Sequence, residues 1–409
     1  AIMSLKKLYF KGSGGNQLSA LLDLPADGHP EAFALFAHCF TCTKNLKSIN
    51  QISRALTRER VAVLRFDFTG LGESEGDFAD TNFSTNIADL VAAANFLDAE
   101  YEAPKILIGH SLGGAAVLQA AGKIGSSKAV AVIGAPADPG HVMRHFEEHQ
   151  DAIAMDGEAE ITIEGRPFRI KKQFLDDLGE IQMEKAVRNL RKALLIFHSP
   201  MDQTVGIDNA AKIFQYARHP KSFISLDQAD HLLMNAGDAR YVGAMIASWV
   251  RKYLAIERPE PTEESKEKNR VVARIGESGF RTEIMANGLP LVADEPVSVG
   301  GSNMGPTPYD YLVAGLGACT AMTLRMYADR KKWPLEEVVV SLSHKKIHAR
   351  DCQTCETEQT MVDWIERDVE LMGSLDASQS RRLMDIADRC PVHRTLESKV
   401  KIKTSLKSE

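Results

Sequence analysis

Long apolar runs are missing from this chain of 409 residues. A membrane-spanning helix needs roughly 20 consecutive apolar residues, and no uninterrupted run approaches that length. The first residues, Ala1–Lys7, contain lysines but are not followed by the apolar core and small-residue cleavage site of a secretory signal. The sequence therefore predicts no membrane partner and no secretion.

An excess of charge of one sign is also missing. The 49 Lys and Arg residues nearly balance the 55 Asp and Glu residues, which gives a formal net charge of -6 at pH 7. A mild, dispersed charge does not build the basic surface that binds nucleic acid or anionic lipid. We expect no nucleic-acid partner.

Cysteine is scarce, with six residues in the whole chain. Two close pairs, Cys39 with Cys42 and Cys352 with Cys355, accompany the separated Cys319 and Cys390. In a large chain without a signal peptide this usage indicates thiol chemistry or metal binding, not a secreted disulfide framework. The predicted compartment is the cytoplasm.

What is present in the first half is a regular alternation of strands and helices. Residues 5–24 alternate apolar and polar side chains as an edge hairpin does, and the buried strands that follow are continuously apolar. We expect strands at 32–37, 61–66, 105–109, 129–135, 193–197 and 222–226, and helices at 49–59, 84–100, 115–121 and 239–255. This order predicts a doubly wound, mostly parallel sheet.

The alternation breaks between residues 136 and 189. Residues 161–170 predict a small hairpin that turns at Glu164–Gly165, with helical segments on either side. An insertion at this point is expected to lie over the carboxyl ends of the strands as a small lid.

A serine lies at a sharp turn between a strand and a helix. The segment reads Gly109-His110-Ser111-Leu112-Gly113, after an apolar strand and before an alanine-rich helix. Such an elbow exposes the serine hydroxyl to a base, and glycines on both sides avoid crowding by a Cβ atom. The pattern predicts that Ser111 is a nucleophile.

Residues 8–255 resemble the α/β-hydrolases, and in particular small esterases with an H-G-F-T loop, a D-x-x-G-x-G-x-S turn and a G-H-S-x-G-G elbow. The matching segments are His38-Cys39-Phe40-Thr41, residues 67–74 and residues 109–114. Matched motif by motif, the resemblance implies the nucleophile Ser111, the acid Asp202 and the base His231, in the order that this fold uses. It also implies an oxyanion hole made by the backbone N–H groups of Phe40 and Leu112, and no cofactor.

The implied chemistry has a physical basis. A serine hydroxyl needs a neutral imidazole to take its proton during attack, and an aspartate on the other ring nitrogen fixes the tautomer. The expected reaction is hydrolysis of a small-molecule carboxylic ester through an acyl-enzyme. Thioester and peptide substrates stay open, because the lid shapes the acyl pocket.

Several residues near these motifs have alternative interpretations. Asp208 is a weaker candidate for the acid, and Asp230 is adjacent to the base in the sequence. We expect His38 and His110 to shape the pocket and Asp67 to cap a turn.

Cys39 occupies the position where the esterases usually carry glycine, which restricts the backbone next to Phe40. We expect Cys39 and Cys42 to pack as small residues, with a redox role as the alternative.

A charged, proline-rich segment at 256–269 predicts an exposed linker between two domains. Beyond it we expect an antiparallel meander at 271–275, 281–286 and 289–293, a long helix at 309–332, strands at 338–348 and 361–371, a helix at 377–389 and a last strand at 399–406. The predicted domains are 1–255, with the lid at about 136–189, and an α+β domain at 270–409.

Two segments of the second half, residues 305–320 and 390–396, resemble the OsmC family. The resemblance covers about 270–407 and implies an intertwined homodimer, hence a homo-oligomer. In the characterised branch, which reduces organic hydroperoxides, Cys319 corresponds to the peroxidatic thiolate and Cys390 to the resolving thiol. An organic hydroperoxide and a dithiol reductant are the implied partners. Pro391 suits the first position of a helix, which predicts Cys390 at its cap.

This chain departs from the peroxidase branch near the first cysteine. Tyr309 stands where that branch has a carboxylate, with Asp310 next to it, and the matching arginine is either Arg274 or Arg281. The alternative for Cys319 and Cys390 is a pair of buried core residues.

A cluster of His344, His348, Cys352 and Cys355 contains one C-x-x-C half-site for zinc, but no second one completes the pattern. We expect an exposed, reducible hairpin there and no metal. The whole sequence predicts a serine esterase fused to an OsmC-like domain. Two alternatives treat the chain mainly as a thiol-dependent hydroperoxide reductase with an accessory hydrolase, or the OsmC-like domain only as an oligomerisation module.

Overall fold

The computed structural model describes residues 5–39, 42–140, 149, 153, 155–163, 166–254, 271–277, 279–348 and 361–406. Within them the chain divides into two compact units. One unit is formed by residues between 2 and 272 together with 285–290, and the other by 273–284 and residues from 291 onward.

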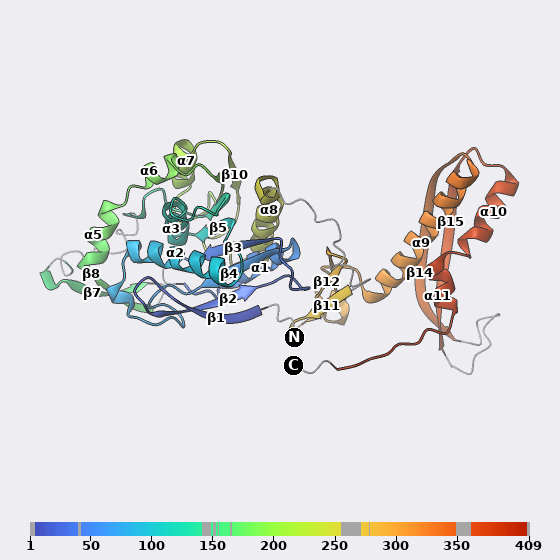
Figure 1. Ribbon diagram of the computed structural model, residues 1–409, viewed down its shortest axis with the longest axis horizontal. Helices are drawn as coiled ribbons and strands as arrows, with labels where there is room; N and C mark the ends of the chain where they lie inside the picture. The colour runs from blue at the N-terminus through green and yellow to red at the C-terminus, as the bar shows by residue number, and fades with distance from the viewer. Residues whose placement is uncertain are drawn as a thin grey trace. The chain divides into compact units, whose positions relative to one another are not determined.

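An eight-stranded sheet forms the centre of the first unit (Figure 1). Its strand order is β1-β2-β4-β3-β5-β6-β9-β10. β1 and β2 form an antiparallel hairpin, β2 pairs antiparallel with β4, and the strands from β4 to β10 pair in parallel. The bounds are β1 Leu5–Lys11, β2 Gln17–Asp23, β3 Ala32–Ala37, β4 Val61–Phe66, β5 Ile106–His110, β6 Ala129–Ile133, β9 Ala193–His198 and β10 Lys221–Ser225. The predicted mostly parallel sheet is confirmed.

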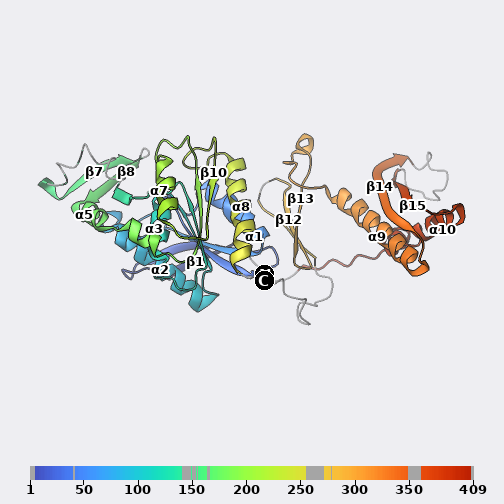
Figure 2. The same cartoon turned by 90° about the horizontal axis from the view of Figure 1, so that it is seen from above.

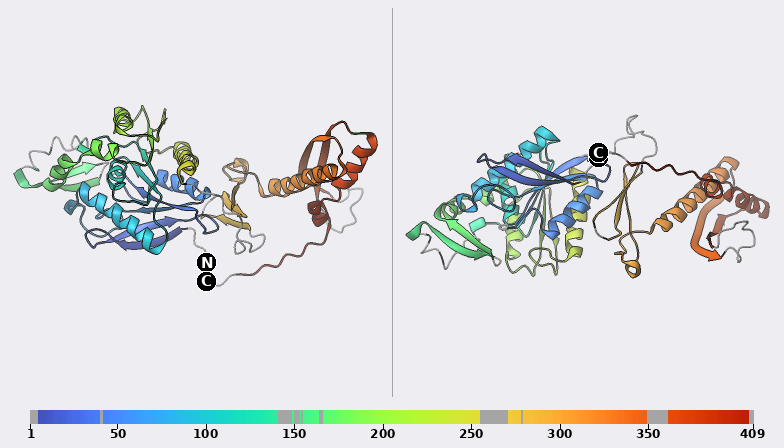
Figure 3. Two further views of the ribbon diagram at one scale, coloured as in Figure 1. Left: turned by 45° about the horizontal axis from the view of Figure 1, so that its top comes forward. Right: turned by 90° about the horizontal axis from the view of Figure 1, so that it is seen from below.

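Helices cover both faces of this sheet (Figures 2 and 3). One apolar core joins the sheet to α2 and α3, and a second core on the opposite face joins it to α1 and α8. Strands β3 to β6 and β9 are buried along their whole length because both of their faces are covered. The helices are α1 Lys47–Arg58, α2 Phe83–Glu100, α3 Leu112–Ala120, α7 Asp208–Tyr216 and α8 Ala236–Leu254.

The expected insertion contains a hairpin of β7 Glu158–Ile163 and β8 Arg166–Lys171, followed by α5 Lys172–Glu180 and α6 Met183–Arg188. The predicted hairpin is confirmed, although its turn at Glu164–Gly165 lies outside the described residues. Arg169 pairs with Asp77 at 2.8 Å, just before the short helix η1 Phe78–Asp80, and Asp177 accepts hydrogen bonds from Ser84 of α2. The insertion is thus tied to the segment between β4 and β5.

The second unit combines helices with two antiparallel arrangements. β11 Val271–Ile275, β12 Thr282–Ala286 and β13 Leu289–Ala293 form one small sheet, and the long strands β14 Leu335–His348 and β15 Met361–Gly373 form a hairpin. The helices are η3 Val297–Val299, α9 Pro308–Lys331, α10 Ala377–Ala387 and α11 Pro391–Glu397. Leu324, Leu335 and Leu383 from α9, β14 and α10 meet in its core.

One predicted strand is wrong. Residues 399–406 alternate apolar and polar side chains, yet they have no regular secondary structure. Val400 and Ile402 are 58% and 87% exposed, so their apolar side chains do not pack onto a core. Alternation gives a segment two faces, but a strand also needs a neighbouring edge to bond.

Candidate active site

Ser111 lies at the junction of β5 and α3 with a φ of 55°. Its N–H donates to the carbonyl of Ile133 at 2.8 Å, which fixes the elbow against the neighbouring strand. A Cβ atom at Gly109 would lie 2.3 Å from the carbonyl oxygen of Gly113, and one at Gly113 would lie 2.3 Å from that of His38. Both glycines are therefore required by close backbone approach, as the sequence predicts.

The loops that follow β9 and β10 bring two more side chains to this serine. The distance from His231 Nε2 to Ser111 Oγ is 2.9 Å, and that from His231 Nδ1 to Asp202 Oδ2 is 2.7 Å. The other carboxylate oxygen of Asp202 accepts the N–H groups of Thr204 and Val205, which orients the carboxylate toward the ring. The structure brings together the three residues that the sequence singles out.

The environment of Asp202 favours its ionised form. Burial opposes ionisation, but hydrogen bonds from His231 and from the backbone N–H groups outweigh it and hold the pKa of this carboxyl below its usual range. At neutral pH an ionised Asp202 accepts a proton-bearing Nδ1, so Nε2 is left to accept from the serine. Asp208 begins α7, and Asp230 accepts the N–H groups of Leu232 and Met234.

Three further histidines are buried around this site, and each hydrogen-bonds a backbone carbonyl. His110 Nε2 donates to the carbonyl of His231 at 2.6 Å, His198 Nε2 to that of Val205 at 2.7 Å, and His38 Nδ1 to that of Cys39 at 2.8 Å. Burial lowers the pKa of all three, and that of His110 to about 3, with the neighbouring His231 as its second cause. They are therefore neutral donors that hold the loops of the site. No sequence motif marks His198.

Because these histidines are neutral, we expect the folded protein to lose stability on acidification at pH values well above those at which carboxylates titrate. A histidine with a lowered folded pKa contributes its full stability above pH 6.5, and the contribution is lost as the pH falls from 6.5 toward the folded value. Between pH 7 and pH 5, His110 alone accounts for a loss of roughly 2 kcal/mol in the free energy of unfolding. Thermal unfolding measured by calorimetry across this range checks the prediction.

The matched variants are His110→Gln and His29→Gln, because His29 is exposed. The dependence of the free energy of unfolding on pH should become weaker only in His110→Gln. An unchanged slope in His110→Gln would contradict the assignment. Asp202 does not interfere, because the hydrogen bonds from His231 and the backbone hold the pKa of its carboxyl below its usual range, away from this pH interval.

The structure describes only one of the two expected oxyanion donors. Leu112 is the first residue of α3, so its N–H is among the four that have no partner within the helix. Phe40 lies outside the described residues.

The expectation that Cys39 and Cys42 pack as unbonded small residues is wrong, because they form a disulfide with a Cα separation of 5.3 Å. The N–H of Cys42 donates to the carbonyl of Cys39, and this turn brings the two side chains within bonding reach.

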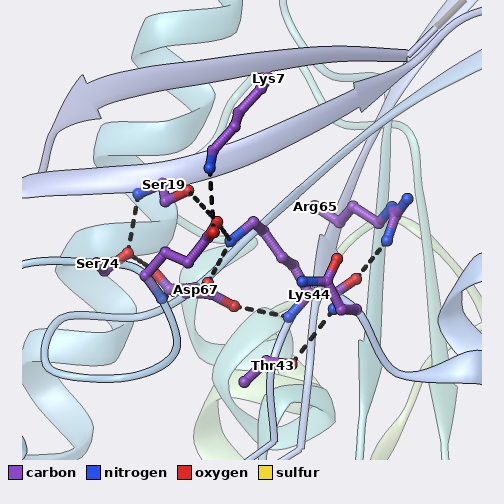
Figure 4. A network of polar contacts seen from close by, with 9 residues as sticks. Lys7, Ser19, Thr43, Lys44, Arg65, Asp67 and Ser74 are labelled. Atoms are coloured by element: carbon purple, nitrogen blue, oxygen red, sulfur yellow. Dashed lines mark hydrogen bonds and ion pairs between the residues drawn. The ribbon is translucent and has the colours of Figure 1, made fainter.

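A buried ion-pair network holds the end of the loop after β3 (Figure 4). Lys44 Nζ pairs with Asp67 and, at 2.8 Å, with Glu73, although the Lys44 side chain is only 1% exposed. The backbone N–H of Lys44 donates to Asp67 at 2.7 Å, and the backbone carbonyl of Lys44 accepts from Arg65. The expectation that Asp67 caps a turn is confirmed by the N–H of Glu73, which also donates to it. The buried cation had no signal in the sequence.

Replacing Lys44 by methionine is expected to destabilise the protein by roughly 3 kcal/mol, because a buried carboxylate on Asp67 loses its cation. Urea unfolding checks this value. The control is Lys7→Met, which removes an exposed pair with Glu73 and an exposed contact with the Tyr9 ring and should change stability little. Equal changes in the free energy of unfolding in the two variants would contradict a stabilising role of the buried Lys44 pair.

In the second unit, Cys390 is buried at the N-cap of α11 and Cys319 of α9 is partly exposed, and both are free thiols. The predicted position of Pro391 at the first turn is confirmed. Cys390 Sγ lies 3.6 Å from Thr320 Oγ1, which accepts from Arg367 at 3.1 Å. No signal in the sequence marked Arg367, because no motif includes this arginine of β15, and Thr320 is the last residue of the segment 305–320 but had no predicted role.

The residues near the start of α9 serve local contacts. Asp310 forms a capping box with Thr307, and those hydrogen bonds lower the pKa of Asp310. Tyr309 stacks on His344 with 4.3 Å between ring centroids, and His344 Nε2 lies 2.9 Å from Asp363. Arg274 pairs with Glu283 at 3.4 Å, and the correspondence of Arg274 or Arg281 to the arginine of the peroxidase branch stays a prediction.

The described parts of the chain contain no group of three or more His, Cys, Asp or Glu side chains placed to hold a metal ion. Cys352, Cys355 and the side chain of His348 lie outside those parts, so the structure does not test that cluster. Within the described ranges, no helix is both long enough and apolar enough to cross a membrane. The homo-oligomer and the cytoplasmic location stay predictions.

Comparison with known proteins identifies two parts of the chain. Residues 34–264 match the model of the alpha/beta hydrolase family, and residues 300–405 match that of the OsmC-like proteins. The esterase domain of a Rhodothermus marinus protein, a solved structure, is 55% identical, covers 62% of this chain and 100% of its own, and has a TM-score of 0.52. Est1E from Butyrivibrio proteoclasticus with bound ferulic acid is 21% identical, covers 61% of this chain and 99% of its own with a TM-score of 0.51, and shows the fold alone.

Two curated relatives have the same description, mitochondrial palmitoyl-protein thioesterase ABHD10. The Mus musculus protein is 28% identical over 186 residues, which are 43% of this chain and 61% of that protein. The Rattus norvegicus protein is 36% identical over 101 residues, which are 24% of this chain and 33% of that protein. The match thus spans about three fifths of the mouse relative and one third of the rat relative.

Proposed function

We propose, because this chain belongs to the alpha/beta hydrolase family and carries an OsmC-like domain, that it is a serine hydrolase that cleaves carboxylic esters through an acyl-enzyme on Ser111. The observation that carries the proposal is the pair of hydrogen bonds that His231 makes with Ser111 and with Asp202, at 2.9 and 2.7 Å. This arrangement supplies a nucleophile, a base and a group that orients the base.

The reaction proceeds in two halves. His231 Nε2 takes the proton of Ser111 as Oγ attacks the ester carbonyl, and Asp202 stabilises the imidazolium through Nδ1. The N–H of Leu112 and the N–H of residue 40 stabilise the oxyanion. His231 then gives its proton to the departing alcohol, which leaves the acyl group on Ser111. Water, activated by the same histidine, releases the acid.

The substrate class has two candidates with the same chemistry. The 55% identity to a solved esterase domain supports an oxygen ester. The name of the mouse and rat relatives supports an acyl thioester, whose thiolate leaving group depends less on protonation by His231. Both bonds break by attack of Ser111 on the acyl carbon.

A panel of p-nitrophenyl esters and acyl thioesters of matched chain length tests this proposal in the full-length protein. A burst of p-nitrophenol equal to the enzyme concentration, with the acyl mass found on the peptide that contains Ser111, supports the acyl-enzyme. Absence of turnover on both classes of substrate would overturn the proposal.

The second unit supports a second candidate activity, reduction of organic hydroperoxides. The observation that favours it is that Thr320, next to Cys319 in α9, lies 3.6 Å from the thiol of Cys390. A Cys319 thiolate attacks the peroxide oxygen and releases the alcohol, which leaves a sulfenic acid. The thiol of Cys390 condenses with it to a disulfide and water, and an external dithiol restores both thiols.

Replacing Cys319 by serine is expected to abolish cumene hydroperoxide consumption with a dithiol reductant, because the attacking thiolate is lost. Peroxide loss measured over time checks this. In the companion variant Cys390→Ser, one peroxide per chain should react and the sulfenic acid should persist for trapping by dimedone. No turnover by the intact protein would exclude this activity and leave assembly as the alternative role of the unit.

A further inference from the structure

The loop between β3 and α1 contains a covalent bond that the proposed chemistry does not use. Cys39 and Cys42 form a disulfide within it, whereas Cys319 and Cys390, the other described cysteines, are free thiols. Both bonded side chains are only 4% exposed. The bond thus lies inside the unit, next to the nucleophile elbow, and not on its surface.

This disulfide contributes little as a fold staple. It encloses only the two residues between Cys39 and Cys42, and the entropy that a cross-link removes from the unfolded chain is smallest for the shortest loops. Other contacts already fix the two flanks of the loop. His38 Nδ1 donates to the carbonyl of Cys39, and Lys44 is held by Asp67 and Glu73. The bond therefore adds a further constraint on Cys39 and Cys42 themselves.

The location of Cys39 couples the disulfide to the site. Cys39 lines a small cavity together with Leu112 and Gly113, the first two residues of α3. The backbone approach there is close, since a Cβ atom at Gly113 would lie 2.3 Å from the carbonyl oxygen of His38. In the sequence, residue 40, the proposed oxyanion donor, stands between the two cysteines. A shift of Cys39 therefore alters the proposed oxyanion hole directly.

We infer that Cys39 and Cys42 form a thiol–disulfide exchange site for a small dithiol, and that opening this bond lowers the rate of hydrolysis. The inference rests on the proposed function of Ser111. A thiolate of the dithiol attacks one sulfur, the Cys39–Cys42 bond breaks, and the released thiolate takes a proton. The second thiol of the dithiol resolves the mixed disulfide. Two electrons and two protons pass to the protein, and the dithiol becomes a disulfide.

The direction of the effect follows from packing. In the bonded state the disulfide and the hydrogen bond from Cys42 N–H to Cys39 O, 3.2 Å long, close the same turn. After reduction the two buried sulfur atoms are no longer bonded and must separate to van der Waals contact. The loop backbone therefore moves. Displacing a catalytic donor by about 1 Å costs up to roughly 100-fold in rate.

The test compares the full-length protein before and after treatment with excess dithiothreitol, which is removed by gel filtration before the assay. Trypsin cleavage after Lys11 and Lys44 releases residues 12–44 as one peptide, and Cys39 and Cys42 are its only cysteines. Alkylation and mass spectrometry therefore report the state of this bond alone. We expect kcat for a p-nitrophenyl ester to fall by about 10- to 100-fold on reduction, with a smaller change in KM, and to recover on reoxidation with diamide.

Two double variants separate the sources of the response. Cys39→Ala with Cys42→Ala should have the low kcat and no response to the dithiol. Cys319→Ser with Cys390→Ser should respond as the parent protein does. Equal kcat in both states of the parent, or a bond that the dithiol never opens in the folded protein, would overturn this inference alone. No turnover in either state would overturn the proposed function, and this inference with it.

Discussion

Replacing Ser111 by alanine is expected to lower kcat for p-nitrophenyl ester hydrolysis by roughly 10⁴-fold or more. The variant loses the only oxygen that His231 Nε2 hydrogen-bonds among the described residues, so no acyl-enzyme forms. The residual rate comes from the remaining donors and from substrate binding. Initial rates at saturating substrate, together with the loss of the p-nitrophenol burst, measure the effect.

Ser126→Ala is the matched control for this change. The Ser126 hydroxyl donates to the carbonyl of Pro104, on the turn that precedes β5, and has no contact with His231. Its kcat should stay within about twofold of the parent value, as for a substitution away from the reacting groups. Full activity in Ser111→Ala would refute the acyl-enzyme on this serine.

Asp202→Asn is expected to lower kcat by roughly 10³- to 10⁴-fold while the fold is retained. An asparagine that donates its amide to Nδ1 stabilises the opposite imidazole tautomer, and Nε2 then carries a proton and cannot accept that of Ser111. Activity measured against pH should show a partial recovery at high pH, where hydroxide assists removal of the proton.

The control for this variant is Asp208→Asn, because Asp208 is the weaker candidate acid in the sequence. Asp208 begins α7 and is exposed. The substitution should leave kcat nearly unchanged. A large loss in Asp208→Asn with little loss in Asp202→Asn would reverse the assignment of the acid.

The elbow and the residues that meet it could be predicted because their signals are local. Ser111 and Asp202 follow continuously apolar runs that read as buried strands, and His231 follows the last strand of the sheet. The carboxyl ends of parallel strands lie along one edge of the sheet. For these residues, sequence position and spatial position are linked by the fold class.

The parts that could not be predicted depend on partners far along the chain. The buried charge of Lys44 is tolerated only because Asp67 and Glu73 come from a different turn, 23 and 29 residues away. The failed strand at 399–406 is the opposite case, in which a suitable pattern found no edge to pair with. A local pattern indicates which side chains a segment can bury and which strand pairing it can form. It does not indicate whether another segment of the fold lies close enough to pack against it or pair with it.

The positive φ of Ser111 lowers the stability of the folded protein. A non-glycine residue at 55° is conformationally disfavoured, so the protein is less stable with its reactive hydroxyl than it would be with glycine at the same point. Selection for stability alone would therefore remove the serine. The activity proposed for this serine and the stability of the fold therefore oppose each other at this residue, and the rest of the hydrolase fold compensates for the difference.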